Sequence, residues 1–221
     1  RLEDAIASYR KAIAIHSEYA EAHSNLGNVL NEQGKLDEAL ASYRQAIAIR
    51  PDFADAHSNL GNVLNEQGKL DEAVESYLRA LAIRPDYAEA HSDLGNTLLG
   101  LGKLDEAVAS YRKALAIKPD FASAHNNLGH ALNELGRSEE AIVSCHTALS
   151  INPDFAIAHN TIGIGLKNLG RLDEAVASYR RALAMMPDLA EAHHNLGNAL
   201  RDLGRLDEAA ASCRKALAIK P

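Results

Sequence analysis

Apolar and polar residues follow the spacing of α-helices along this chain, and the pattern recurs every 34 residues. Within 54–67, apolar Ala56, Leu60, Val63 and Leu64 recur at helical intervals. After a short break, a second run has Ala73, Tyr77, Ala80, Leu81 and Ile83 at the same kind of spacing. Each unit is therefore predicted to be a pair of helices, and the fold class is predicted to be all-α.

Glycine and proline mark the ends of these predicted helices. All six prolines occupy one position of the repeat, and twelve of the fourteen glycines occupy two. Gly68 supplies the left-handed conformation that ends the first helix, and Pro85 closes the second. Gly61 lies inside the first helix, where glycine costs about 1 kcal/mol relative to alanine, so a neighbouring helix is expected to approach closely there. Asp86, with Glu89 three residues later, predicts a capping box for the next first helix.

The period divides the chain into repeats. A half repeat, 1–19, holds only a second helix, and a nearly complete repeat, 190–221, comes last. Between them lie the complete repeats 20–53, 54–87, 88–121, 122–155 and 156–189. Such units grow by stacking, so we expect one continuous solenoid domain. Because the chain begins at Arg1 and not at Met, we also expect it to be part of a longer protein.

The repeat resembles a known family over the whole chain. The residues that carry the resemblance are Leu60-Gly61, Ala73, Tyr77, Ala80 and Pro85, which match the tetratricopeptide repeat. The resemblance implies a right-handed α-solenoid superhelix of antiparallel helix pairs, with the first helices lining its concave face. Where the family often has Trp or Tyr at the fourth position, every complete unit here has His, as at His57.

The sequence of the first helix also resembles the tetratricopeptide arm of O-linked N-acetylglucosamine transferases and their bacterial relatives. The residues that carry this resemblance are Ala56-His57-Ser58-Asn59-Leu60-Gly61-Asn62. In that arm a ladder of asparagines grips the backbone of an extended peptide. The rungs that this resemblance implies here are Asn25, Asn59, Asn127 and Asn195, with Asp93 and Thr161 interrupting the ladder.

The polar positions of the first helices are the candidate binding residues. The predicted peptide-binding groove consists of Asn25, Asn28, Asn59, Asn62, Asp93, Asn96, Asn127, His130, Ile157, Ile164, Asn195 and Asn198. An amide offers both a donor and an acceptor to a peptide backbone. The N-terminal part is expected to be acidic, through residues such as Glu21, Asp55 and Glu66, and Ile157 with Ile164 predicts an apolar anchor. The competing interpretations are solvated asparagines, and isoleucines that pack against a neighbouring helix.

Charge and composition exclude several classes of function. The net charge is −7 and the pI about 5.8, whereas a surface that binds nucleic acid normally has an excess of Lys and Arg. No apolar run approaches the roughly 18 residues that span a membrane. The positions where a chaperone-type carboxylate clamp places cations hold Ser58, Glu66, Ser92 and Gly100, so that function is disfavoured. We expect a cytoplasmic protein that binds neither nucleic acid nor membrane.

The repeated histidines and the two cysteines are expected to be structural. Parallel neighbouring helices lie about 8–10 Å apart, too far for same-position histidines to share a metal ion at roughly 2 Å. Packing with a hydrogen-bonded ring nitrogen is the predicted role. Cys145 and Cys213 replace the tyrosine of the second helix, so burial without a disulfide is expected. No catalytic or nucleotide-binding motif occurs, and neither a cofactor nor enzyme activity is predicted.

Three functions remain open on the sequence alone. The first is a non-catalytic scaffold that binds a protein or an extended peptide. The second is a substrate-recruiting arm of a larger glycosyltransferase-like enzyme. The third is self-assembly, because solenoid ends without polar caps expose core surface. As the two ends differ, that contact would be head-to-tail, although truncation of a longer chain gives the same exposed ends.

Overall fold

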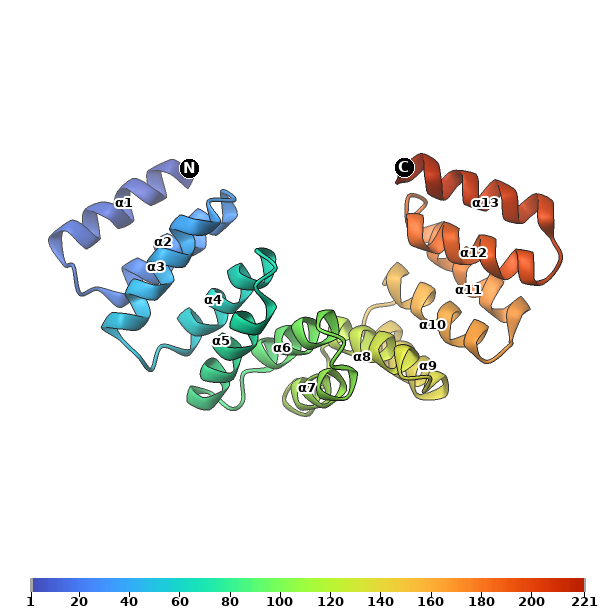
Figure 1. The fold of residues 1–221 in the computed structure, drawn as a ribbon, viewed down its shortest axis with the longest axis horizontal. Coiled ribbons are helices and arrows are strands. Elements are labelled where there is room, and N and C mark those ends of the chain that lie inside the picture. Colours follow the sequence, from blue (N-terminus) through green and yellow to red (C-terminus); the bar gives the residue numbers. More distant parts are fainter. Residues whose placement is uncertain (1, 221) are drawn as a thin grey trace. The chain divides into compact units, whose positions relative to one another are not determined.

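The computed structural model describes residues 2–220, and all of the regular structure in that range is helical. Thirteen α-helices and no strands are present there (Figure 1). The chain divides into two compact units, Arg1–Ile117 and Lys118–Pro221, which we call unit 1 and unit 2. The predicted all-α fold of helix pairs is confirmed.

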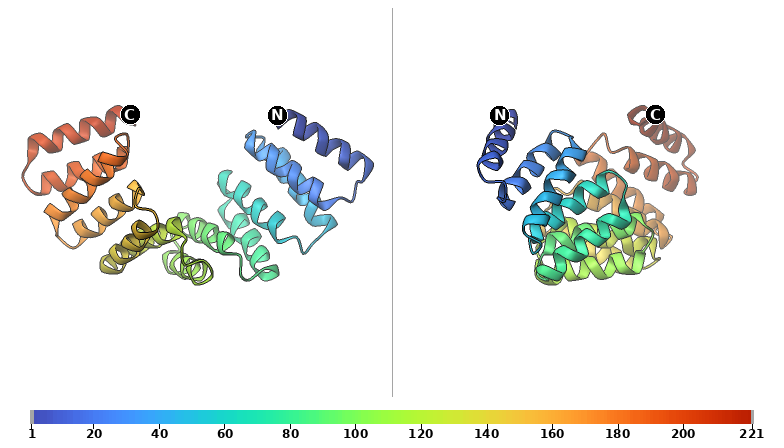
Figure 2. Two further views of the ribbon diagram at one scale, coloured as in Figure 1. Left: turned by 180° about the vertical axis from the view of Figure 1, so that it is seen from behind. Right: turned by 60° about the vertical axis from the view of Figure 1, so that its left-hand side comes forward.

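Unit 1 contains three helix pairs preceded by one further helix. Its helices are α1 (Leu2–Ile15), α2 (Ala20–Glu32), α3 (Leu36–Ile49), α4 (Ala54–Glu66), α5 (Leu70–Ile83), α6 (Ala88–Gly100) and α7 (Leu104–Ile117). Each first helix (α2, α4 and α6) packs against the second helix that precedes it and the one that follows it. The two helices of a pair run antiparallel (Figure 2).

Unit 2 repeats the arrangement with three further pairs. Its helices are α8 (Ala122–Glu134), α9 (Ser138–Ile151), α10 (Ala156–Asn168), α11 (Leu172–Met185), α12 (Ala190–Asp202) and α13 (Leu206–Ile219). Its core includes the fully buried alanines 148, 158, 175 and 199 together with Ile162, Leu166 and Tyr179. Small alanine side chains let the helices approach closely, and the larger residues fill the remaining space.

The turn inside each pair is closed by a glycine, as predicted. Gly68 has φ of +74°, in the left-handed region that glycine adopts without steric cost. The amide of Lys69 then donates to the carbonyl of Leu64 at 2.9 Å, which satisfies a carbonyl at the end of α4. The equivalent glycines have φ between +72° and +75°.

The predicted close approach at Gly61 is also confirmed, and its partner is an aromatic ring. A β-carbon at Gly61 would lie 2.8 Å from Cε1 of Tyr77 on α5. Gly27 and Gly95 face Tyr43 and Tyr111 in the same way. The first helix therefore keeps glycine because the tyrosine of the second helix occupies the space of a side chain.

Five of the six repeated histidines pack as predicted, with one ring nitrogen hydrogen-bonded, whereas His159 forms no such bond with the described residues. Nε2 of His57 lies 3.0 Å from the carbonyl oxygen of Pro51, and His91, His125 and His193 make the same contact with Pro85, Pro119 and Pro187. His23 contacts the carbonyl of Ser17. Cys145 is buried, Cys213 is partly buried, and both thiols are free.

The predicted capping box at Asp86 is wrong. Helix α6 begins at Ala88, and its N-cap residue is Tyr87, which makes no side-chain capping bond. Asp86 therefore lies one residue too early. Tyr87 occupies the N-cap position instead, and the guanidinium of Arg84 lies 4.5 Å from its ring centroid.

Candidate functional site

The asparagines of unit 1 form hydrogen bonds from one repeat to the next. Nδ2 of Asn59 on α4 donates to Oδ1 of Asn28 on α2 at 3.0 Å. The same oxygen accepts a second hydrogen bond from the hydroxyl of Tyr43 at 2.8 Å. Asn28 thus links a neighbouring first helix to the second helix of its own pair. Asn25, one turn earlier on α2, is exposed.

The bond between tyrosine and asparagine recurs in each pair of unit 1. Tyr77 donates to Oδ1 of Asn62 at 2.7 Å, and Tyr111 donates to Oδ1 of Asn96 at 2.8 Å. The tyrosines are almost fully buried, so each amide is held by a rigid group with its oxygen toward the core. From the sequence, these tyrosines are predicted only to pack between helices. The available signal was the constant separation of 15 residues between Asn and Tyr.

A pocket of about 260 Å³ opens between the first helices of unit 1. Asn31, Asn62, Asn65, Glu66, Tyr77, Asp93 and Asn96 line it. These residues come from α2, α4, α5 and α6, so the structure brings the predicted Asn62, Asp93 and Asn96 together at one hollow. We call it the amide pocket. Oδ1 of Asn65 accepts a hydrogen bond from Thr97 at 3.2 Å.

Two acidic residues that were expected to make the N-terminal groove acidic are instead paired with arginine. Arg84 forms two hydrogen bonds with the carboxylate of Asp55, at 2.8 and 2.9 Å. Arg50 pairs with Glu21 of the same repeat. The hydrogen bonds from Arg84 lower the pKa of Asp55. These four residues therefore contribute little net charge.

Asp93 differs from the other rung residues because it is a partly buried carboxyl group. Its side chain forms no hydrogen bond or ion pair with any residue that the structure describes. Burial raises its pKa to about 6, and repulsion from Glu89 adds to the shift. Glu66, exposed at the same pocket, is likewise without a cationic partner among the described residues.

The candidate residues of unit 2 are arranged differently. Nδ2 of Asn195 donates to Oδ1 of Asn160 at 3.1 Å, and Asn160 donates to Glu191 at 3.0 Å. Asn198 contacts His194 on its own helix at 2.9 Å. Asn127 and His130 on α8 are partly buried. No Tyr–Asn bond occurs in the described part of unit 2.

The expected apolar anchor has one exposed member and one that packs against the core. Ile157 on α10 is 40% exposed, whereas Ile164 is partly buried against the core of unit 2. Ile164 stands where unit 1 has Asn28, Asn62 and Asn96. As a result, the hydroxyl of the fully buried Tyr179 has no hydrogen-bond partner among the described residues.

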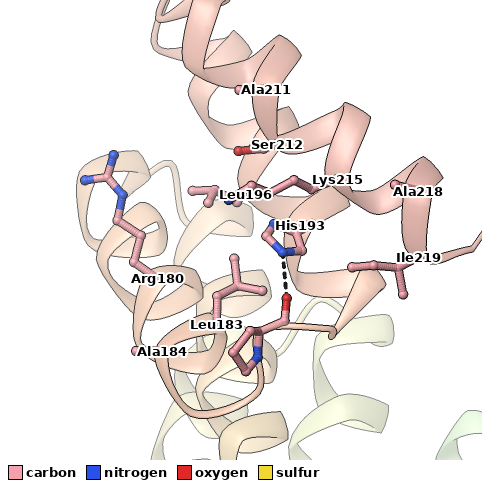
Figure 3. Close-up of a pocket in the computed structure, with 11 residues that line it drawn as sticks. Arg180, Leu183, Ala184, His193, Leu196, Ala211, Ser212, Lys215, Ala218 and Ile219 are labelled. Carbon is pink, nitrogen blue, oxygen red and sulfur yellow. Dashed lines mark hydrogen bonds between the residues drawn. The ribbon is translucent and has the colours of Figure 1, made fainter.

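A second kind of pocket lies on another face of the first helices. Figure 3 shows the one in unit 2, about 550 Å³ in volume, between α11, α12 and α13. Leu183, Pro187, Leu196 and Ile219 form its apolar part, and His193 contacts Pro187 inside it at 2.9 Å. Unit 1 has a counterpart of about 570 Å³ between α5, α6 and α7. The matching repeat positions indicate that these pockets follow from helix packing.

No other type of site appears in the described residues. Between residues 2 and 220, no three His, Cys, Asp or Glu side chains are grouped so that they could bind a metal ion. Among the thirteen described helices, none is long and apolar enough to span a membrane.

Comparison with protein-family models identifies the same repeat family along the chain. Models described as "TPR repeat" match residues 1–31, 27–68, 61–102 and 95–136. Models described as "Tetratricopeptide repeat" match 122–155 and 160–221. A search of curated proteins found no match.

Solved structures with a similar fold include several repeat proteins. One is YrrB, described as a TPR protein with an unusual peptide-binding site, with 24% identity, a TM-score of 0.71, and coverage of 84% of this chain and 96% of that one. MamA has 26% identity and a TM-score of 0.63, with coverage of 73% and 94%. A chain of the APC/C hetero-tetramer Cut9-Hcn1 has 18% identity and a TM-score of 0.84 over all of this chain and 44% of that one.

Proposed function

The chain belongs to the tetratricopeptide repeat family, and from this premise we propose that it is a non-catalytic scaffold whose first helices bind an extended peptide. The observation that carries the proposal is the row of asparagines in unit 1 whose oxygens are held by buried tyrosines. In unit 2, the candidate residues from Asn127 to Asn198 are proposed to bind peptide separately from those of unit 1.

Fixed amides suit the recognition of a peptide backbone. When the oxygen of Asn62 accepts from Tyr77, its N–H groups are left for carbonyl groups of a ligand. Because the side chain is already oriented, binding costs less conformational entropy. Such contacts do not depend on the side chains of the peptide. The description of YrrB as a peptide-binding repeat protein supports the proposal at the level of the shared fold.

The proposal is tested by removing two rung asparagines, one on α2 and one on α4. Asn25 is exposed and Asn59 is partly buried. A random peptide library is selected on the wild-type protein, and the affinity of a labelled peptide from it is measured by fluorescence anisotropy. Asn25→Ala with Asn59→Ala is expected to weaken binding at least about tenfold, since each lost hydrogen bond contributes about 1 kcal/mol. The control, Gln45→Ala with Arg79→Ala, changes exposed residues of α3 and α5. Equal affinity in both double variants would refute the groove.

Self-association is the second candidate function, supported by apolar residues at both ends of the described helices. Ile15 is 73% exposed, and Leu206 and Leu217 on α13 are 64% and 65% exposed. A head-to-tail contact would place α13 against α1, both second helices, whereas the second helices inside each unit pack against first helices. We therefore expect a weak contact. Sedimentation at increasing concentration tests it, and a constant monomer mass would exclude it.

The recruiting-arm alternative is distinguished by the parent gene. The observation that favours this alternative is the resemblance of the first-helix sequence to the tetratricopeptide arm of O-linked N-acetylglucosamine transferases. A catalytic domain encoded after Pro221 would support it, and a stop codon at that point would exclude it.

A further inference from the structure

The acidic residues of the first helices in unit 1 fall into two groups. Glu21 and Asp55 are neutralised by Arg50 and Arg84. Asp93, in contrast, lies deeper and has no partner of opposite charge among residues 2–220. A carboxylate taken partly out of water and left unpaired costs free energy. A ligand that supplies the missing charge recovers part of that cost.

Replacement of a rung asparagine by aspartate changes what the rung can recognise. Asp93 occupies the repeat position of Asn25 and Asn59, and the two side chains have nearly the same shape. The amide can donate and accept, whereas the ionised carboxylate can only accept. Asp93 therefore cannot hold a peptide carbonyl and requires a donor from the ligand.

The surroundings of Asp93 favour a cationic donor. Glu66 contributes a second carboxylate to the amide pocket, and Glu89 adds negative charge from the same helix as Asp93. Burial raises the pKa of Tyr77 and of Tyr111, and the negative charge of Asp93 adds to both shifts. Among the residues that line the pocket none is basic.

We propose that the amide pocket binds the cationic side chain of a lysine or arginine in the bound peptide, with Asp93 as its main partner and Glu66 as the second. The inference rests on the proposed function and names the side-chain chemistry of the same site. Asn62 and Asn96, on either side of the pocket, hold the backbone while the carboxylates select the cation. Charge-assisted hydrogen bonds of this kind are about twice as strong as neutral ones.

The test uses matched peptides and two isosteric variants. A peptide selected on the wild-type protein is synthesised with Lys, Arg, Gln or Glu at each position in turn. Dissociation constants are measured for the wild-type protein, for Asp93→Asn and for Asp105→Asn. The last variant removes the same charge from an exposed residue of α7 outside the pocket.

At one peptide position we expect Lys or Arg to bind the wild-type protein about tenfold more tightly than Gln, and Glu to bind least tightly. Asp93→Asn should remove this preference and leave the affinity for the Gln peptide unchanged or higher. Asp105→Asn should keep the preference. Preference for Arg over Lys would indicate paired hydrogen bonds, and equal preference would indicate recognition of charge alone.

Two kinds of failure are distinguishable. If peptides bind and depend on Asn25 and Asn59, but the preference for a cation is absent or survives in Asp93→Asn, the present inference is wrong and the proposed function stands. If no peptide binds, or binding is independent of the asparagines, the proposed function fails and this inference fails with it. Thermal melts of each variant verify that it is folded.

Discussion

In the candidate site of unit 1, the hydroxyl groups of buried tyrosines fix the orientation of asparagine side chains. Tyr77 fills the space beside Gly61 and also donates to Asn62, so one side chain both closes the core and orients a surface amide. Where Ile164 replaces the asparagine, Tyr179 keeps its packing position but has no acceptor among the described groups. Asn195 then donates to Asn160, whereas its counterpart Asn59 donates to Asn28. One substitution thus changes the hydrogen bonding of two repeats.

The two tyrosines provide a direct comparison. Tyr77→Phe removes the hydrogen bond from Tyr77 to Asn62 and is expected to lower the free energy of unfolding by about 1 kcal/mol. Tyr179→Phe removes a buried hydroxyl without a partner, so its effect is expected to be about zero or slightly stabilising. Urea unfolding of both variants checks this. A larger loss for Tyr179→Phe than for Tyr77→Phe would contradict the assigned hydrogen bonds.

The raised pKa of Asp93 predicts a pH-dependent contribution to stability. Its pKa is about 6 in the folded protein, above the value of 3.8 for an unperturbed aspartate, so the folded state holds the proton more tightly than the unfolded chain. The stabilisation from protonated Asp93 is therefore complete below about pH 4 and is lost as the pH rises through about 6. Asp93→Asn should increase stability at pH 7.5, by on the order of 1–3 kcal/mol, and leave it nearly unchanged at pH 4. Denaturant unfolding at both pH values measures the difference, and an equal effect at both would exclude this origin.

At the scale of helices, the positions of glycine could be predicted more fully than the contacts of polar residues. The turn at Gly68 and the close approach at Gly61 follow from local conformation and from recurrence, which the sequence displays directly. The cap of α6 was predicted wrongly because the helix begins one residue later than the spacing of Asp86 and Glu89 implies. The bond from Tyr77 to Asn62, and the pairing of Asp55 with Arg84 across 29 residues, depend on how helices are placed.

Two helical glycines test the account of packing. Gly61→Ala is expected to destabilise the protein by about 1–3 kcal/mol, because the added carbon meets the Tyr77 ring and forces it to move. Gly100→Ala is the matched control. Its β-carbon would lie 3.6 Å from Leu70, and alanine favours the helix by up to about 1 kcal/mol. Thermal denaturation of both variants is the measurement, and equal melting temperatures would contradict the packing described for Tyr77.

At the scale of the whole molecule, similar repeats carry different surfaces. The Tyr–Asn pairs all lie in unit 1, while unit 2 has Cys145 with His130, Tyr179 with Ile164, and Cys213 with Asn198 at the same positions. The two units therefore have the same helix arrangement but present different side chains at the candidate binding positions. The central claim is that unit 1 presents oriented amides to a peptide backbone.

The most direct test is an NMR titration that follows the side-chain amide signals of asparagine. With ¹⁵N-labelled protein and a peptide selected on it, the account predicts that the Nδ2 signals of Asn25, Asn59, Asn62 and Asn96 shift together and saturate with one dissociation constant. Signals from Lys113 and Ile117, which line the other pocket of unit 1, should stay unchanged. Shifts confined to the residues of that pocket, with the asparagine signals unmoved, would contradict the claim.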